Sequence, residues 1–151
     1  MPDTNTTPTA TPDADPIEQL VRISRRLRHS NARALAPLGL SPHQARALRL
    51  VAREAPIRPS VLAECLHIVP RSATQVVDDL VNAGWVARSP DPDDRRATLL
   101  TLTEAGTEVA RQSAEIRAAE QHRLLEPLTP EDRDRLKHLL DLIEARQTID
   151  R

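Results

Sequence analysis

The sequence predicts a mainly α-helical fold with one small β-hairpin, on three observations. Apolar residues recur at helical spacing in several segments, each opened by a capping residue or a proline. Residues 59–83 have the pattern of a short helix, a tight turn and a second helix. Two β-prone runs follow, 85–89 and 97–102, around a linker with three aspartates and two adjacent arginines. A helix-turn-helix followed by a basic-tipped hairpin predicts a winged helix-turn-helix with a two-stranded β wing.

Composition favours one globular domain with no membrane partner. The chain has 151 residues, of which 39% are hydrophobic and 28% charged. No apolar run approaches the roughly 20 residues of a membrane span, and no hydrophobic signal region is present. A single cysteine excludes an internal disulfide framework, so we expect a cytoplasmic protein. Residues 1–15 lack large apolar side chains and are predicted to form a disordered tail, leaving 16–151 as a single domain.

The first two predicted helices have clear start and stop signals. Pro16 opens a helix that extends to about residue 36, and Gly39 is placed to adopt a left-handed cap after it. Ser41, followed by Pro42 and Gln44, forms a capping-box sequence that opens the second helix, which extends to about residue 54.

Prolines also open the two helices of the predicted helix-turn-helix. Pro59 begins a helix to Leu66, and Pro70 begins the helix that would face DNA. The second of these helices carries one stripe of apolar residues spaced for burial: Ala73, Val76, Val77 and Leu80. Its two acids, Asp78 and Asp79, lie farther along the helix, where we expect them to form ion pairs.

Two helices follow the hairpin, so that helices flank the winged helix on both sides. Thr103 is placed to cap a long helix to about residue 126, and Thr129 with Pro130 opens the last helix. We therefore expect a winged helix over about 41–102, with dimerisation helices over about 16–36 and 103–149. The last helix should contribute an apolar stripe to an obligate intersubunit interface, on the order of 2,000 Å² or more: Leu136, Leu139, Leu140 and Ile143.

The order of elements and several motifs resemble the MarR family of bacterial winged-helix transcription regulators. The matching stretches are residues 40–44, 62–63, 76–84, 91–96 and 102–106. The resemblance covers residues 17–149 and implies a homodimer on a pseudo-palindromic operator, often released from DNA by a small ligand or by oxidation. Two features depart from the family: Val69 stands where a capping Ser or Thr is usual, and Trp85 is the only aromatic residue.

Three polar residues near the start of the second helix of the helix-turn-helix are candidates for reading DNA bases. Because the apolar stripe faces the core, Arg71, Ser72 and Gln75 point outward. Arg71 is suited to guanine and Gln75 to adenine, while Ser72 is suited to a base or a phosphate. The alternative is an ordinary polar helix face.

The wing carries the other DNA candidates. The family's Asp-x-Arg pattern falls on Asp94 and Arg96, which implies that Arg96 enters the minor groove while Asp94 holds its guanidinium in a bidentate pair. Arg95 is expected to contact phosphate. The alternative is a hairpin turn whose charges only maintain solubility.

A run of arginines suggests an anion site. Residues 21–53 contain eight arginines and no acid, which indicates either a solvated surface or a positively charged ligand site. By the resemblance, ligands bind where the dimerisation helices meet the winged helix. The candidates there are Arg33, Arg46, Arg49, His29 and His43, and the expected ligand is a carboxylate with an apolar body.

Other classes of function find less support. Cys65 is expected to fill the core, and the five histidines show no metal-binding spacing, so no metal or cofactor is expected. We find no catalytic constellation, and one aromatic residue offers no stacking platform for RNA. The favoured hypothesis is a dimeric repressor of duplex DNA. The alternatives are a winged-helix ligand- or protein-binding module without operator binding, and an enzyme on a helical scaffold.

Overall fold

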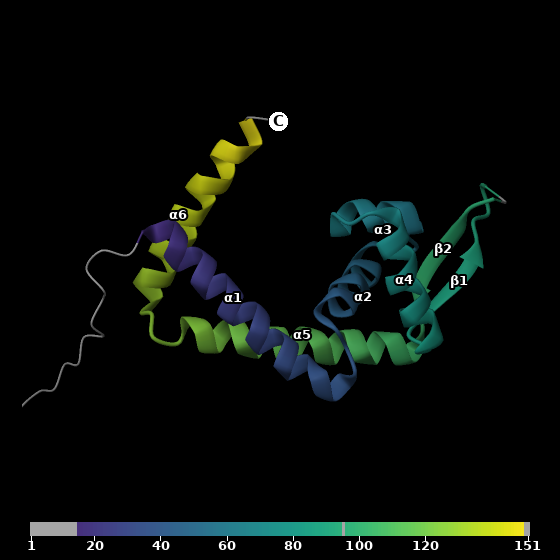
Figure 1. Ribbon diagram of the computed structural model, residues 1–151, viewed down its shortest axis with the longest axis horizontal. Helices are drawn as coiled ribbons and strands as arrows, with labels where there is room; N and C mark the ends of the chain where they lie inside the picture. The colour runs from purple at the N-terminus through teal and green to yellow at the C-terminus, as the bar shows by residue number, and fades with distance from the viewer. Residues whose placement is uncertain (1–14, 95, 150–151) are drawn as a thin grey trace, which may run out of the picture.

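The computed structural model of the protein describes residues 15–94 and 96–149. Over these residues the fold class is confirmed, because the chain forms six α-helices and a single two-stranded antiparallel sheet, which lies at one edge of the molecule (Figure 1). In chain order the elements are α1 (Pro16–Leu35), the 3-10 helix η1 (Ala36–Leu38), α2 (Pro42–Glu54), α3 (Pro59–Leu66), α4 (Pro70–Asn82), β1 (Val86–Pro90), β2 (Thr98–Leu102), α5 (Glu104–Leu125) and α6 (Pro130–Ile149).

The helix start signals form as their sequences predict, with one correction. Ser41 accepts from the backbone N–H of Gln44 at 3.2 Å, and the Gln44 side chain accepts from the Ser41 N–H at 2.8 Å, so the capping box is complete. Asp15, however, belongs to α1 and not to the tail, because its carboxylate accepts from the Ile17 N–H at 2.9 Å. Asp is a strong N-cap residue, and the helix that it caps begins at Pro16 as predicted. The rest of the predicted tail lies outside the described residues.

We call α2, α3, α4 and the β1–β2 hairpin together the head. The hydrophobic core lies among these elements. Four leucines there are almost completely buried: Leu48, Leu62, Leu80 and Leu100. The predicted stripe of α4 faces this core, although Val76 is only partly buried. Val69 makes no side-chain cap, and α4 begins at Pro70 as expected.

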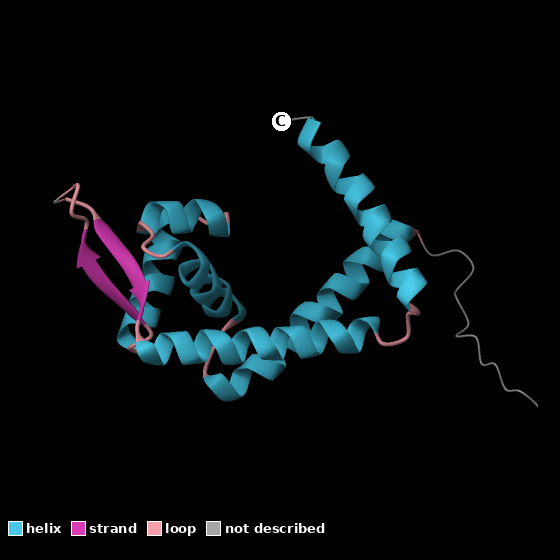
Figure 2. Cartoon of the chain, turned by 180° about the vertical axis from the view of Figure 1, so that it is seen from behind, coloured by secondary structure: helices cyan, strands magenta, loops and turns pink. Residues whose placement is uncertain are grey.

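The hairpin is attached to the head at its base. Val86 pairs with Leu102 and Pro90 with Thr98 at the two ends of the β1–β2 ladder. Ile57, in the connection between α2 and α3, exchanges two backbone hydrogen bonds with Leu100 at 3.2 and 2.9 Å. The middle of β2 is therefore joined to the connection before α3, while the far end of the hairpin projects outward from the helices (Figure 2).

The helix α5 connects the head to the rest of the chain. Figure 1 shows the head at one end of α5, α1 crossing α5, and α6 projecting from the other end. We call α1 and α6 the arms. Large apolar side chains on both arms are 39–63% exposed: Ile17, Leu20, Val21, Ile23, Leu139, Leu140, Leu142 and Ile143. Across the described residues, no helix has the length and apolar character needed to cross a bilayer.

Candidate nucleic-acid interface and arginine cavity

The exposed edge of α4 carries the three predicted base-reading residues. Arg71, Ser72 and Gln75 are all exposed, since Ala73 and Val77 between and after them turn inward. Within the described part of the chain, Arg71 has no acidic partner, so its guanidinium is available to an external acceptor. Gln75 donates to Asp79 at 2.9 Å, which orients its amide along the helix.

The two acids of α4 behave differently from each other. Asp78 forms the expected ion pair, at 2.5 Å to Arg88 on β1, and so ties α4 to the first wing strand. Asp79 instead accepts the hydrogen bond from Gln75, a side chain four residues earlier on the same helix face. The ion pair with Arg88 reduces the repulsion between Asp78 and a nearby phosphate, whereas the neutral amide of Gln75 leaves the negative charge of Asp79 in place.

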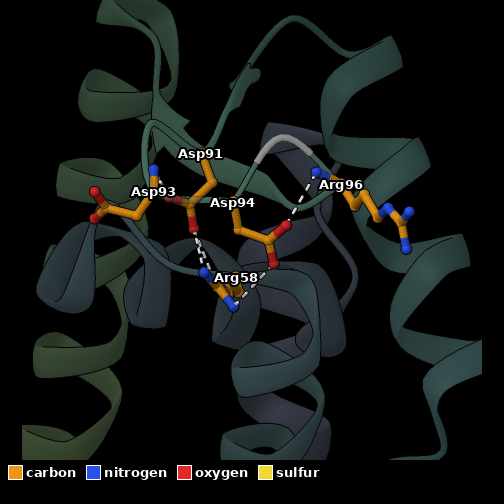
Figure 3. A network of polar contacts seen from close by, with 5 residues as sticks. All are labelled: Arg58, Asp91, Asp93, Asp94 and Arg96. Carbon is orange, nitrogen blue, oxygen red and sulfur yellow. Dashed lines mark hydrogen bonds and ion pairs between the residues drawn. The ribbon is translucent and has the colours of Figure 1, made fainter.

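At the wing tip, the predicted pairing of Asp94 with the Arg96 guanidinium is wrong. Asp94 Oδ1 accepts from the backbone N–H of Arg96 at 3.1 Å, and Asp94 Oδ2 lies 3.9 Å from Arg58 Nη1. A carboxylate readily reaches the backbone N–H two residues on, and this Asx turn competes with the side-chain pair. The Arg96 guanidinium points away from Asp94 and is exposed (Figure 3). Arg95, the predicted phosphate contact, lies outside the described residues.

Two functional candidates were missed by the sequence analysis, Arg58 and Asp91. Asp91 is only 6% exposed, and its Oδ2 accepts from Arg58 Nε at 2.8 Å and Nη2 at 2.5 Å. Its Oδ1 accepts from the backbone N–H of Asp93 at 3.0 Å. The Asp93 amide, and after it Arg58, hold the pKa of Asp91 below its usual value. Three aspartates in a loop that faces DNA would repel phosphate, which indicates that some of them pair with arginines. This was the one sequence signal for the Arg58–Asp91 pair.

The five predicted ligand residues do not form one site. His43, Arg46 and Arg49 line a cavity of about 690 Å³ between α1, α2 and α5, which we call the arginine cavity. His29 and Arg33 lie on another face of α1, where they border a separate hollow with Glu120 and Arg123 of α5. The structure therefore brings three of the five residues to one cavity and places the other two outside it, because residues 29 and 33 share one face of α1 whereas 28, 31 and 35 share another.

The arginine cavity combines positive charge with an apolar wall. Arg28 and Arg117 join Arg46 and Arg49 around it, and Leu35, Pro42 and Ala45 provide the wall. Burial, followed by repulsion from Arg117, Arg46 and Arg53, lowers the pKa of Arg49. Two buried polar atoms at the cavity, Arg117 Nε and Asn31 Oδ1, have no hydrogen-bond partner within the described chain. A cavity of this kind favours an anion with an apolar body.

Arg46 has a structural partner as well as a place in the cavity. Its Nη1 and Nη2 donate to the carbonyl oxygens of Leu66 and Cys65, both at 3.1 Å. These carbonyls belong to the last turn of α3, immediately before the turn into α4. Arg46 therefore connects the arginine cavity to the helix-turn-helix. Cys65 itself is partly buried and packs against the core.

The fold and these exposed residues define a winged-helix protein that presents a polar helix edge and an exposed wing arginine on one head. The chain matches the MarR family over residues 38–97. It is 33% identical over 126 residues to an HTH-type transcriptional regulator of Mycobacterium bovis, covering 83% of this chain and 85% of that protein. The chain belongs to the MarR family of transcriptional regulators.

Two solved structures of similar proteins contain operator DNA or a small acid. One is a mutant of MarR from Escherichia coli complexed with operator DNA, with a TM-score of 0.74 and 27% identity over 85% of this chain and 93% of that one. The other is a MarR family protein of Mycobacterium tuberculosis in complex with salicylic acid. Its TM-score is 0.70, with 28% identity over 89% of this chain and 99% of that one.

Proposed function

We propose that the protein is a homodimeric, sequence-specific repressor that binds duplex DNA and is released by a small anionic ligand. The observation that carries this proposal is the placement of exposed Arg71, Ser72 and Gln75 on α4 with exposed Arg96 at the wing of the same head. The operator complex of the similar E. coli protein supports DNA as the partner.

On the operator, α4 enters the major groove by its N-terminal end, and the wing reaches the neighbouring minor groove. Arg71 and Gln75 read base edges, and Ser72 contacts a base or a phosphate. Arg96 inserts its guanidinium into the minor groove, and Arg95 contacts a phosphate. Asp94 positions the backbone of Arg96 by accepting its N–H. Because the partner is genomic DNA, we place the protein in the cytoplasm.

Dimerisation is proposed to bury the apolar side chains of the arms. Leu139 is 57% exposed and Ile143 48% exposed in the single chain, and α1 carries a second exposed stripe. Contiguous exposed apolar surface of this kind on an ordered helix marks a contact with a partner. A second copy that covers both arms would form an obligate interface and hold two heads at a fixed separation.

The arginine cavity is proposed as the ligand site, with a carboxylate on an apolar body as the ligand. The salicylic acid complex of the M. tuberculosis protein supports this chemistry. Arg49 and Arg117 would pair with the carboxylate, and Leu35 would contact the apolar body. Arg46 links the cavity to the last turn of α3, so a ligand that draws its guanidinium away would disturb the start of the reading helix. The ligand relieves repression only if it prefers the conformation that does not fit DNA.

The proposal is tested by measuring DNA binding with fluorescence anisotropy. Wild-type protein first selects its operator from a random duplex pool. Arg96→Ala is then expected to weaken binding by about tenfold or more at physiological salt, with the dimer and the melting temperature unchanged. Arg53→Ala is the matched control, since Arg53 lies on α2 and pairs with Glu54 at the surface. Selection of no duplex would favour the alternative, a winged-helix binding module without operator binding.

A further inference from the structure

Arg58 is the residue just before α3, but its side chain contacts residues of the wing. It contacts Asp91 through two nitrogens and lies 3.9 Å from Asp94 through a third (Figure 3). We call these three residues the wing clamp. Asp94 in turn accepts from the backbone N–H of Arg96. One guanidinium on the head is thereby connected, through the carboxylate of Asp94, to the residue that we place in the minor groove.

Both ends of the wing clamp are fixed. Arg58 is held between Ile57, which is bonded to Leu100 of β2, and Pro59, the first residue of α3. In the wing, the Asp91 N–H donates to the Ala97 carbonyl at 3.1 Å, and the Ala97 N–H donates to the Asp94 carbonyl at 2.8 Å. The clamp therefore joins a rigid point on the head to both sides of the loop that carries Arg96.

Direct contact between Arg58 and DNA does not fit this arrangement. Its Nε, Nη1 and Nη2 already face carboxylate oxygens of Asp91 and Asp94. One arginine with two aspartates carries a net charge of −1, which repels a phosphate. Arg96, in contrast, has no acidic side-chain partner within the described residues and is exposed.

We infer that Arg58 is a positioning residue for DNA binding, which holds the wing so that Arg96 is presented in the orientation needed for the minor groove. This inference rests on the proposed function. The clamp orders the wing loop in the free protein, so the loop loses less conformational entropy when DNA binds. Such preorganisation raises affinity without any new contact to DNA. Arg58 thus contributes to binding by positioning Arg96 and not by contacting DNA itself.

A double-mutant cycle on the selected operator tests the inference. In the wild-type background, Arg58→Gln is expected to weaken binding by about three- to tenfold, the range for a partly exposed charged network that acts in both subunits. In the Arg96→Ala background the same substitution is expected to change affinity by less than about twofold, because the group that it positions is absent. The dependence of affinity on salt should also be unaltered by Arg58→Gln in that background.

Two further variants distinguish a change in the orientation of the wing from a loss of folding stability. Asp94→Asn leaves the Arg58–Asp91 pair in place and is expected to show the same dependence on Arg96. Arg58→Lys keeps a charge beside Asp91 but lacks the fork that reaches both acids, so it should retain the melting temperature and still lose affinity. The inference would be overturned if Arg58→Gln lowered the affinity for the operator equally in the wild-type and Arg96→Ala backgrounds. It would also be overturned if Arg58→Gln made the affinity less dependent on salt in the Arg96→Ala background. Failure of wild-type protein to select any duplex would overturn the proposed function itself, and the clamp's role with it.

Discussion

Gly106 packs directly against the backbone of Trp85, where the head meets α5, and its replacement by alanine is expected to loosen that junction. A Cβ atom at Gly106 would lie 1.8 Å from the carbonyl oxygen of Trp85, whereas ordinary contact begins at 3.4 Å. The two backbones must therefore separate by about 1.6 Å. That movement breaks the Trp85–Thr103 backbone hydrogen bond of 3.0 Å and the Thr103–Gly84 bond of 2.6 Å.

The cost of Gly106→Ala follows from these contacts. Two lost hydrogen bonds cost about 1–3 kcal/mol, and overpacking costs about 1–3 kcal/mol more. Alanine recovers about 1 kcal/mol of helix propensity relative to glycine. The net loss in the free energy of unfolding is about 1–5 kcal/mol, which lowers the melting temperature by roughly 2–20 °C in a chain of this size.

Thermal melts followed by circular dichroism measure this loss, at one fixed protein concentration because dimerisation would otherwise shift the midpoint. Ala105→Gly is the matched control: Ala105 is exposed on the same turn of α5, so this change should cost only about 1 kcal/mol of helix propensity. The reasoning is refuted if Gly106→Ala melts at or above the wild-type temperature. Gly106→Ala should also bind the operator more weakly, since α5 sets the position of the head relative to the arms.

Three further predictions concern the arms, the wing clamp and the arginine cavity. Wild-type protein should sediment as a dimer at micromolar concentration, and Leu139→Glu should shift it toward monomer; a monomeric wild type would contradict the proposed interface. Because the pKa of Asp91 lies below its usual value of 3.8, the stability that its carboxylate provides is complete above that pH and is lost as pH falls through the lower folded-state pKa. Asp91→Asn should therefore show a shallower fall in melting temperature below about pH 4, and parallel curves would argue against the clamp. An aromatic carboxylate at about 100 times its Kd should raise the melting temperature by roughly 5–10 °C, and its neutral amide should raise it by much less. Arg49→Gln should remove this difference between the acid and the amide. Equal rises with the acid and the amide would exclude an anion site.

Local features of the fold could be predicted from the sequence because their causes are local. The Ser41 capping box and the buried positions of α4 depend on residues three or four apart, and both form in the structure. Asp15 shows the limit of reading composition alone. It was grouped with a polar tail, although an aspartate just before a proline is itself a signal for the start of a helix.

The candidate site was predicted less completely, because its geometry depends on contacts distant in sequence. Arg58 and Asp91 are 33 residues apart, and no local pattern connects them. The helical periodicity of α1 places Arg33 on a different face from Arg28, but which of these faces meets Arg49 depends on the way α1 crosses α5 and α2. Asp94 was identified as a positioning residue, but its contacts are the Arg96 backbone and Arg58, because an Asx turn forms within the wing loop.

The most direct test of a winged-helix dimer on duplex DNA is a hydroxyl-radical footprint on the selected operator. Wild-type protein is predicted to protect two half-sites whose centres lie about one helical turn apart, each flanked on its outer side by a protected minor groove. Arg96→Ala, at a concentration that restores full occupancy, should lose the flanking minor-groove protections and keep the two central ones. A single protected half-site, or outer protections that persist without the Arg96 side chain, would contradict the account.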